Sequence, residues 1–112
     1  MKINEFGFKA DYEEATLSFE QVGELRGIIL LEFGAPWCGH CQAANSAIKE
    51  ALIGCSTLSH IKIEDGKGKK LGRAFKVKLW PTLILLQDGQ EVARLVRPLD
   101  SDTVRDLISK SK

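Results

Sequence analysis

The feature that most restricts the fold is the short apolar run IILLEF at residues 28–33, which has a glycine on either side. A run of isoleucine and leucine of this length is typical of a strand that is buried on both faces. Both faces of such a strand must be covered by other elements, and helices are the usual cover. We therefore expect an α/β fold with this strand at the centre of its sheet.

Apolar residues spaced three or four positions apart predict the helices. The predicted helices cover residues 11–25, 41–54 and 100–110, and a shorter one lies within residues 68–77. The second helix begins at a cysteine and is expected to stop at Gly54, a favourable residue for a C-terminus. The last helix has Asp100 or Ser101 as its expected N-cap.

Short apolar or alternating runs between turn residues predict the remaining strands. They cover residues 3–8, 59–64, 82–86 and 91–96, and the first of them is expected at an edge. The last two flank the Asp88-Gly89 turn and form a hairpin. Pro81 must precede its strand because proline cannot donate within a ladder. Strands that alternate with helices and end in a hairpin predict a mixed sheet with helices on both faces.

Length and charge limit the possible functions. The chain has 112 residues, and we expect a single domain over residues 1–112. The net charge of +1 gives no electrostatic argument for nucleic-acid binding, and the lysines at 66–70 are expected to form a solvated loop. No apolar run approaches the about 18 residues of a membrane span, and the first residues lack the apolar core of a signal peptide. We expect a cytoplasmic protein without membrane contact, or the mature form of an exported one.

Two cysteines lie three positions apart in the stretch GAPWCGHC, residues 34–41. A strand that turns directly into a helix puts Cys38 at the first free N–H groups of that helix, where negative charge is favoured. Because the thiolate is the nucleophile, Cys38 is the expected attacking residue. Cys41 lies one helical turn later on the same side and, being less exposed, is expected to have the higher pKa. The pair predicts thiol–disulfide exchange, in which Cys38 attacks a substrate disulfide and Cys41 then displaces the substrate.

Glu32 is a carboxylate within the apolar run. Burying a carboxylate costs several kcal/mol unless it is paired or neutral. The alternation of side chains along a strand permits two interpretations. In one, the carboxylate is buried and helps Cys41 to lose its proton; in the other, it points out to water.

Two other kinds of protein are open alternatives. A structural zinc site usually has a second, closely spaced ligand pair, which this sequence lacks. Its ligands here would be Cys38, His40 and Cys41, together with Cys55 or His60. A redox-inactive interaction module is the other alternative, and the presence of both cysteines argues against it. The third cysteine, Cys55, is expected to be a buried small hydrophobe, with a regulatory or dimerising thiol as the alternative.

The motif WCGHC, the acidic residue six positions before its first cysteine, the triplet WPT at 80–82 and the following Asp-Gly hairpin together resemble the thioredoxin superfamily. The resemblance implies a three-layer α/β sandwich whose central mixed sheet has about four or five strands, flanked by about four helices. It also implies a protein-disulfide oxidoreductase that needs no bound cofactor, because the electrons reside in the cysteines. We expect a disulfide reductase, with an isomerase or oxidase as the alternative. The expected partners of this monomer are disulfide-containing proteins and an electron-donating reductase or thiol pool.

The resemblance further implies roles near the cysteines. Glu32 is expected to accept the proton of the resolving Cys41, and Lys62 falls where the family often has a lysine paired with that acid. The inner dipeptide Gly39-His40 is the one found in protein disulfide isomerases. A protonated histidine there stabilises the thiolate, which predicts a potential shifted from about −270 mV for thioredoxin toward about −180 mV for the isomerase. The alternative is that His40 is exposed and has no redox effect.

The resemblance also identifies a substrate groove. Its expected lining residues are Trp37, Trp80, Pro81 and Thr82. Pro81 resembles the family's cis-proline, which lies against the cysteines and offers neighbouring backbone groups to an extended substrate. Two departures from the family pattern concern this groove. Trp80 replaces a smaller β-branched residue and Arg97-Pro98 replaces a glycine-containing turn, so we expect a narrower or differently charged groove.

Overall fold

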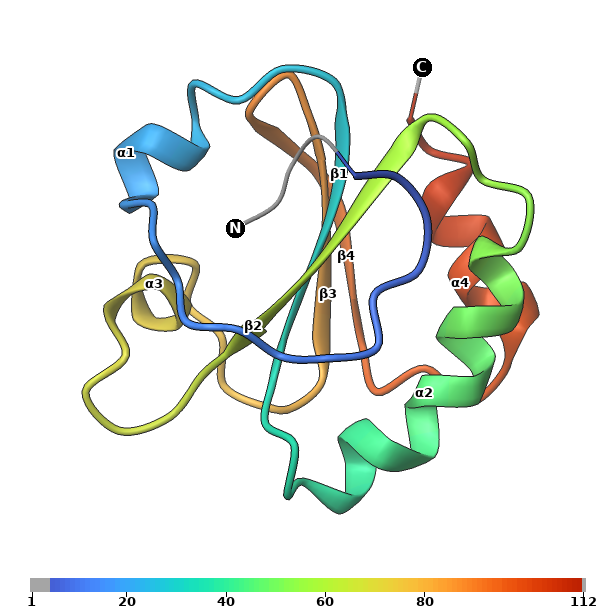
Figure 1. Cartoon of the computed structure of the whole chain (residues 1–112), viewed down its shortest axis with the longest axis horizontal. Coiled ribbons are helices and arrows are strands. Elements are labelled where there is room, and N and C mark those ends of the chain that lie inside the picture. Colours follow the sequence, from blue (N-terminus) through green and yellow to red (C-terminus); the bar gives the residue numbers. More distant parts are fainter. Residues whose placement is uncertain (1–4, 112) are drawn as a thin grey trace.

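The computed structural model describes residues 5–111, within which the chain forms four strands and four helices (Figure 1). The strands are β1 (Ile28–Gly34), β2 (Leu58–Glu64), β3 (Thr82–Gln87) and β4 (Gln90–Val96). The helices are α1 (Phe19–Val22), α2 (Gly39–Leu52), α3 (Lys70–Ala74) and α4 (Ser101–Ile108). This is the α/β class that the sequence predicts.

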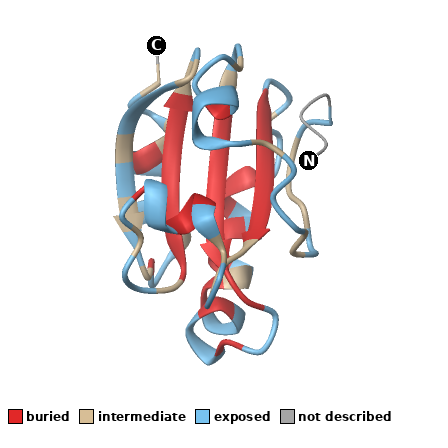
Figure 2. Ribbon diagram, turned by 90° about the vertical axis from the view of Figure 1, so that its left-hand side faces the viewer, coloured by how far each residue is buried: buried red, intermediate tan, exposed pale blue. Residues whose placement is uncertain are grey.

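The strands form one mixed sheet in the order β2-β1-β3-β4. Strand β1 is parallel to β2 and antiparallel to β3, and β3 pairs antiparallel with β4. The predicted central position of β1 is confirmed, because every residue of β1 from Ile29 onward is buried (Figure 2). The predicted hairpin is confirmed as well. Its turn has positive φ at Asp88 (52°) and Gly89 (82°), as a type I′ turn requires.

Helices α2 and α4 cover one face of the sheet, and α1 and α3 cover the other (Figure 1). Alternation along β1 divides its side chains between two cores. Leu30 packs with Ile48 of α2, whereas Phe33 packs with Phe75 beside α3. Each such side chain contributes about 1.5–3 kcal/mol through burial. The same alternation directs Glu32 to the face of Leu30, toward α2.

The predicted helix over residues 11–25 is wrong in extent, since only the single turn α1 is helical. The preceding residues instead run along the edge of β2, where Glu13 forms a parallel bridge with Ile63. The Glu13 N–H donates to the carbonyl of Lys62, and the Glu64 N–H donates to the carbonyl of Glu13, both at 2.9 Å. Backbone groups that pair with a strand cannot also form helical hydrogen bonds, so the helix begins only at the Ser18 capping box.

The predicted edge strand over residues 3–8 lies partly outside the described residues. Within them, Gly7 forms one isolated parallel bridge with Ser59, and its N–H donates to the carbonyl of Leu58 at 2.9 Å. The N-terminal segment therefore follows the β2 edge through two separate bridges, at Gly7 and Glu13, rather than as a regular strand. It still covers backbone groups that an open sheet edge would expose.

The other predicted helices form near their expected positions. Helix α2 begins at Gly39, two residues before the predicted start, and the Asp100 side chain caps α4 by accepting from the Thr103 N–H at 2.8 Å. The half-buried Cys55 packs against the core beneath α2 and α4. No helix among residues 5–111 is long and apolar enough to cross a membrane.

The hairpin turn gives a stability test. A Cβ added at Gly89 would lie 1.9 Å from the carbonyl oxygen of Gly23, whereas one added at Gly54 would meet nothing within 4 Å, and φ is +82° at both positions. Gly54→Ala should cost about 1–2 kcal/mol through the left-handed conformation alone. Gly89→Ala should cost about 1–3 kcal/mol more, because the backbone must also move. Urea unfolding of the two variants measures both costs, and equal costs would show that the contact with Gly23 is unimportant.

Candidate active site

The two cysteines of the WCGHC motif lie where β1 leads into α2. Cys38 is the N-cap of α2, and its sulfur accepts a hydrogen bond from the backbone N–H of Cys41 at 3.3 Å. An acceptor at the first N–H groups of a helix is placed where negative charge is stabilised. Both thiols are free and both residues are buried, with 8% exposure for Cys38 and 3% for Cys41. Cys38 is therefore slightly the more exposed of the two residues.

Glu32 is fully buried on the face of the sheet below α2, with an exposed fraction of 0%. Its Oε2 accepts a hydrogen bond from the hydroxyl of Tyr12 at 2.9 Å, and its Oε1 lies 2.8 Å from Nε2 of His60. The outward orientation is thereby excluded. Two donors satisfy both carboxylate oxygens, which is the condition for burying such a group.

The hydrogen bonds of His60 define its tautomer. Its Nδ1 accepts from the backbone N–H of Lys9 at 2.9 Å, so this nitrogen carries a lone pair. In the neutral ring the proton is then on Nε2, which donates to Glu32. His60 is itself fully buried. His60 thus acts as a neutral hydrogen-bond donor that fixes the position of Glu32.

Tyr12 connects the carboxylate with the resolving cysteine. Its hydroxyl donates to Glu32, and the residue packs against Cys41. Gly34 makes this approach possible, because a Cβ there would lie 2.5 Å from the Tyr12 hydroxyl and 2.6 Å from the Cys41 sulfur. Burial, followed by the charge of Glu32, raises the pKa of Tyr12 above its ordinary value. The phenol therefore keeps its proton.

The environment of Cys41 favours the neutral thiol. Burial, followed by the hydrogen bond with Cys38, raises its pKa to about 11, although the Tyr12 hydroxyl acts in the opposite direction. Cys41 is consequently protonated at neutral pH and must lose that proton before it can act as a nucleophile.

Lys62 does not pair with Glu32, which corrects the expectation from the family. The two residues are aligned in the register of β1 and β2, but the Lys62 amine donates to the carbonyl of Ala10 at 3.0 Å and to Oδ1 of Asn45 at 3.2 Å. It also lies 4.3 Å from the centre of the Tyr12 ring, in cation–π contact. The reason is that His60 and Tyr12 already occupy the two oxygens of Glu32.

The residues predicted to line the substrate groove lie around the bond between Trp80 and Pro81. The Trp80–Pro81 peptide bond is cis, as the resemblance implies. The Trp80 indole N–H donates to Asp65 at 2.9 Å, and its ring lies 5.4 Å from that of Trp37, edge to face. Trp80 packs against the buried cysteines, whereas Trp37 is 72% exposed. Thr82 is buried at the start of β3.

Arg97 lies across the backbone at this cis bond. Its Nε donates to the carbonyl of Trp80 at 2.8 Å, and its own N–H donates to the carbonyl of Pro81 at 2.9 Å. Its φ of 51° is in the left-handed region, where glycine is favoured. The guanidinium is therefore hydrogen-bonded to the carbonyl of Trp80, a residue that packs against the cysteine pair, and it brings positive charge to the groove.

The remaining sequence candidates are not assembled into a second centre. Gly39 and His40 lie exposed in the first turn of α2, directly after Cys38. His60 is separate from His40 and has both ring nitrogens engaged. Among residues 5–111, no group of three or more histidine, cysteine, aspartate or glutamate side chains is arranged to hold a metal ion.

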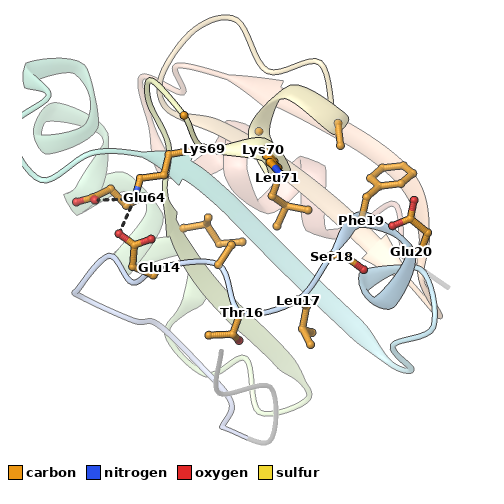
Figure 3. A pocket seen from close by; sticks show the side chains of 15 residues that line it. Glu14, Thr16, Leu17, Ser18, Phe19, Glu20, Glu64, Lys69, Lys70 and Leu71 are labelled. Atoms are coloured by element: carbon orange, nitrogen blue, oxygen red, sulfur yellow. Dashed lines mark hydrogen bonds and ion pairs between the residues drawn. The ribbon is translucent and has the colours of Figure 1, made fainter.

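A separate 530 Å³ pocket lies between residues 14–20 and the start of α3 (Figure 3). Lys69 forms ion pairs with Glu14 and Glu64 at its margin (Figure 3). The residues that line it include neither cysteine of the pair nor Glu32. This pocket is therefore distinct from the cysteine site.

Sequence reasoning missed two members of the site. Tyr12 falls within the helix that the sequence predicts over residues 11–25, and His60 is a candidate only as a metal ligand. A signal did exist for His60, since it occupies an alternating strand next to one that carries an unexplained acid. No comparable signal existed for Tyr12, whose position depends on the pairing of Glu13 with β2.

Comparison with known proteins gives consistent matches over most of the chain. A family model described as Thioredoxin matches residues 12–110. The thioredoxin of Chlamydia trachomatis is 32% identical over 84 residues, which are 75% of this chain and 82% of that protein. Reduced thioredoxin 2 from Pseudomonas aeruginosa has a TM-score of 0.81 at 42% identity, covering 91% of this chain and 94% of that one. A thioredoxin from Halobacterium salinarum has a TM-score of 0.71 at 28% identity, covering 88% and 86%.

These matches confirm the three-layer thioredoxin-like fold that the motifs imply. They also agree with the chemistry of the site, in which a sulfur at a helix N-terminus lies next to a second, protonated thiol. Over almost its whole length, this chain thus belongs to the thioredoxin family of protein-disulfide oxidoreductases.

Proposed function

We propose that the protein reduces protein disulfides, with Cys38 as the nucleophile and Cys41 as the resolving thiol. The observation that carries this assignment is the difference between the two sulfurs. Cys38 is the N-cap of α2, where negative charge is favoured, and burial raises the pKa of Cys41 to about 11. The first sulfur is suited to attack, and the second is suited to wait as a thiol until a mixed disulfide has formed.

The reaction has two exchange steps. The Cys38 thiolate attacks one sulfur of a substrate disulfide, the S–S bond breaks, and the other substrate sulfur leaves as a thiolate. Cys41 then loses its proton and attacks the Cys38 sulfur, which releases the second substrate thiol and leaves a Cys38–Cys41 disulfide. Two electrons have passed to the substrate. No bound cofactor is needed, because the cysteines hold these electrons.

Glu32 is the proposed acceptor for the proton of Cys41. Its two oxygens accept from Tyr12 and His60, so the charge of an ionised carboxylate is compensated in a fully buried position. Tyr12 bonds to Glu32 and packs against Cys41, so a single residue joins the base to the thiol. General-base assistance of this kind is worth about 10²–10⁴-fold in rate.

Trp37, Trp80, Pro81 and Thr82 are the proposed contacts for an extended segment of the substrate. The engagement of the Trp80 carbonyl by Arg97 supports selection among substrates at this position, because a substrate must compete with the guanidinium. Lys62, Gly39 and His40 are proposed to tune the redox potential. Lys62 does so from its place against the Tyr12 ring, and the dipeptide does so from the turn after Cys38.

We further propose that a reductase or thiol pool regenerates the dithiol and that the protein acts as a cytoplasmic monomer. An isomerase-like or oxidising role is the alternative. It requires a protonated His40 that stabilises the Cys38 thiolate; His40 directly follows the turn at Cys38 but is exposed, as the interpretation without a redox effect expects. The equilibrium potential of the pair separates the alternatives, since a reductant is expected near about −270 mV and an isomerase near about −180 mV.

Cysteine substitutions test the assigned roles. Cys41→Ser should trap the substrate on Cys38 as a mixed disulfide, because the second exchange step is lost, whereas Cys38→Ser should form no such adduct. Cys55→Ser is the matched control and should reduce insulin at the unsubstituted rate, since Cys55 packs beneath α2 away from the pair. Mass spectrometry of the non-reduced reaction identifies the adducts. Insulin reduction by Cys38→Ser would refute the assignment.

The raised pKa of Cys41 predicts a pH dependence of stability. The thiol titrates at about 9 when its surroundings are ordinary and at about 11 in the folded protein. As pH rises from 9 toward 11, the unfolded chain therefore loses its proton first, and the reduced protein is destabilised. The loss relative to Cys41→Ser should be on the order of 2 kcal/mol. Urea unfolding at pH 8 and pH 11 measures it, and an unchanged difference between the two proteins would contradict the raised pKa.

A further inference from the structure

We propose that the hydroxyl of Tyr12 carries the proton between Cys41 and Glu32 during the second exchange step. The inference rests on the proposed role of Glu32 and assigns the route by which the proton reaches it. The Tyr12 hydroxyl donates to Oε2 of Glu32 at 2.9 Å, and Tyr12 also packs against Cys41, whose sulfur borders the same space beside Gly34 as the hydroxyl.

The surrounding structure holds the hydroxyl in this position. Gly34 leaves the space that the hydroxyl and the Cys41 sulfur share, because a Cβ there would lie 2.5 and 2.6 Å from them. The Lys62 amine lies over the Tyr12 ring, and the bridge between Glu13 and Ile63 fixes the next residue of the chain. The phenol is thus fixed from both its ring and its backbone.

His60 and Tyr12 donate to different oxygens of Glu32. The N–H of Lys9 donates to Nδ1 of His60, so Nε2 carries the other proton and donates to Oε1 of Glu32. Oε2 is the oxygen that accepts from Tyr12, so a proton that passes through the phenol arrives there.

The transfer balances without any added reactant. The S–H bond of Cys41 breaks as its proton passes to the Tyr12 oxygen, and the original Tyr12 proton passes to Oε2 of Glu32. The products are a Cys41 thiolate and a neutral Glu32, with Tyr12 unchanged. Tyr12 now donates to the thiolate, in agreement with its lowering effect on the pKa of Cys41. The thiolate then attacks the Cys38 sulfur of the mixed disulfide.

Several charged or titratable groups lie around this hydroxyl. They are Glu32 from β1, His60 and Lys62 from β2, and Cys38 and Cys41 at the start of α2. The competing route is through water, in a 250 Å³ pocket lined by residues that include Asp11, Tyr12, Cys41, Asn45 and Lys62. An experiment must therefore distinguish proton transfer through the phenol from transfer through water in this pocket.

The first test is a single-turnover reaction with a peptide disulfide, quenched with acid and analysed for the mixed disulfide by mass spectrometry. Tyr12→Phe and Glu32→Gln should each slow the decay of the mixed disulfide by about 10²-fold at neutral pH. Formation of the mixed disulfide by Cys38 should be unchanged, which serves as the internal control. The double variant should be no slower than Glu32→Gln alone, because both changes interrupt one route.

The pH profile gives a readout that a purely structural role would not change. The Tyr12→Phe rate should rise with pH as hydroxide takes over the proton. Resolution by Tyr12→Phe at the unsubstituted rate, with Glu32→Gln still slow, would overturn the role of Tyr12 and leave that of Glu32 intact. Unchanged rates in both variants would overturn the role of Glu32 as well.

A second test does not depend on the folding of Tyr12→Phe. Tyr12 is the only tyrosine of the chain, so biosynthetic replacement by 3-fluorotyrosine changes this hydroxyl alone. Fluorine makes the hydroxyl a stronger donor to the developing thiolate. The rising limb of the resolution profile should therefore shift to lower pH. An unchanged profile would mean that the proton travels through water.

Discussion

The buried carboxylate of Glu32 is the constraint on which the site depends. Removing such a charge from water costs several kcal/mol, and the cost is met only if its oxygens find donors. Hydrogen bonds to charged groups contribute about 1.5–3 kcal/mol each, so the bonds from Tyr12 and His60 together approach this cost. Neither donor comes from β1 itself. The N-terminal segment and β2 must therefore be in place before the carboxylate is tolerated.

This dependence links the edge of the sheet to the chemistry of the cysteines. The N-terminal segment covers β2 through bridges at Gly7 and Glu13, and between them it supplies the Lys9 N–H to His60 and the Tyr12 hydroxyl to Glu32. A segment without regular structure thus orients the groups below Cys41. Cys38 is the N-cap of α2 and accepts from the Cys41 N–H, so its sulfur owes its position mainly to the start of that helix.

The elements predicted well from the sequence are those whose pattern is local. The run at 28–33 needs only its own composition to indicate a central strand, and the Asp88-Gly89 turn needs only its two residues to indicate a hairpin. The helix expected over 11–25 failed because Glu13 pairs with Ile63, fifty positions later, and this pairing outweighs the helical spacing of the apolar residues. The pattern of neighbouring residues contains no information about a pairing with a distant strand.

The site divides in the same way. Cys38 and Cys41 follow from one motif, and the resemblance to thioredoxins supplied Glu32 and the cis bond at Pro81. The expected pairing of Lys62 with Glu32 was wrong. The adjacent strand carries His60 two residues earlier, and the carboxylate is hydrogen-bonded to that ring instead. Tyr12 and His60 lie 20 and 28 positions from Glu32, so only the folded chain brings the three together.

The most direct test of this account is the infrared spectrum of Glu32 in the reduced protein at neutral pH, taken as the difference between the unsubstituted protein and Glu32→Gln. The account requires an ionised carboxylate that accepts from Tyr12 and His60 and is free to take the proton of Cys41. The difference spectrum should therefore contain a carboxylate stretching band assigned to Glu32. A protonated-carboxyl band in its place would contradict the account, because the resolving thiol would then have no base beneath it.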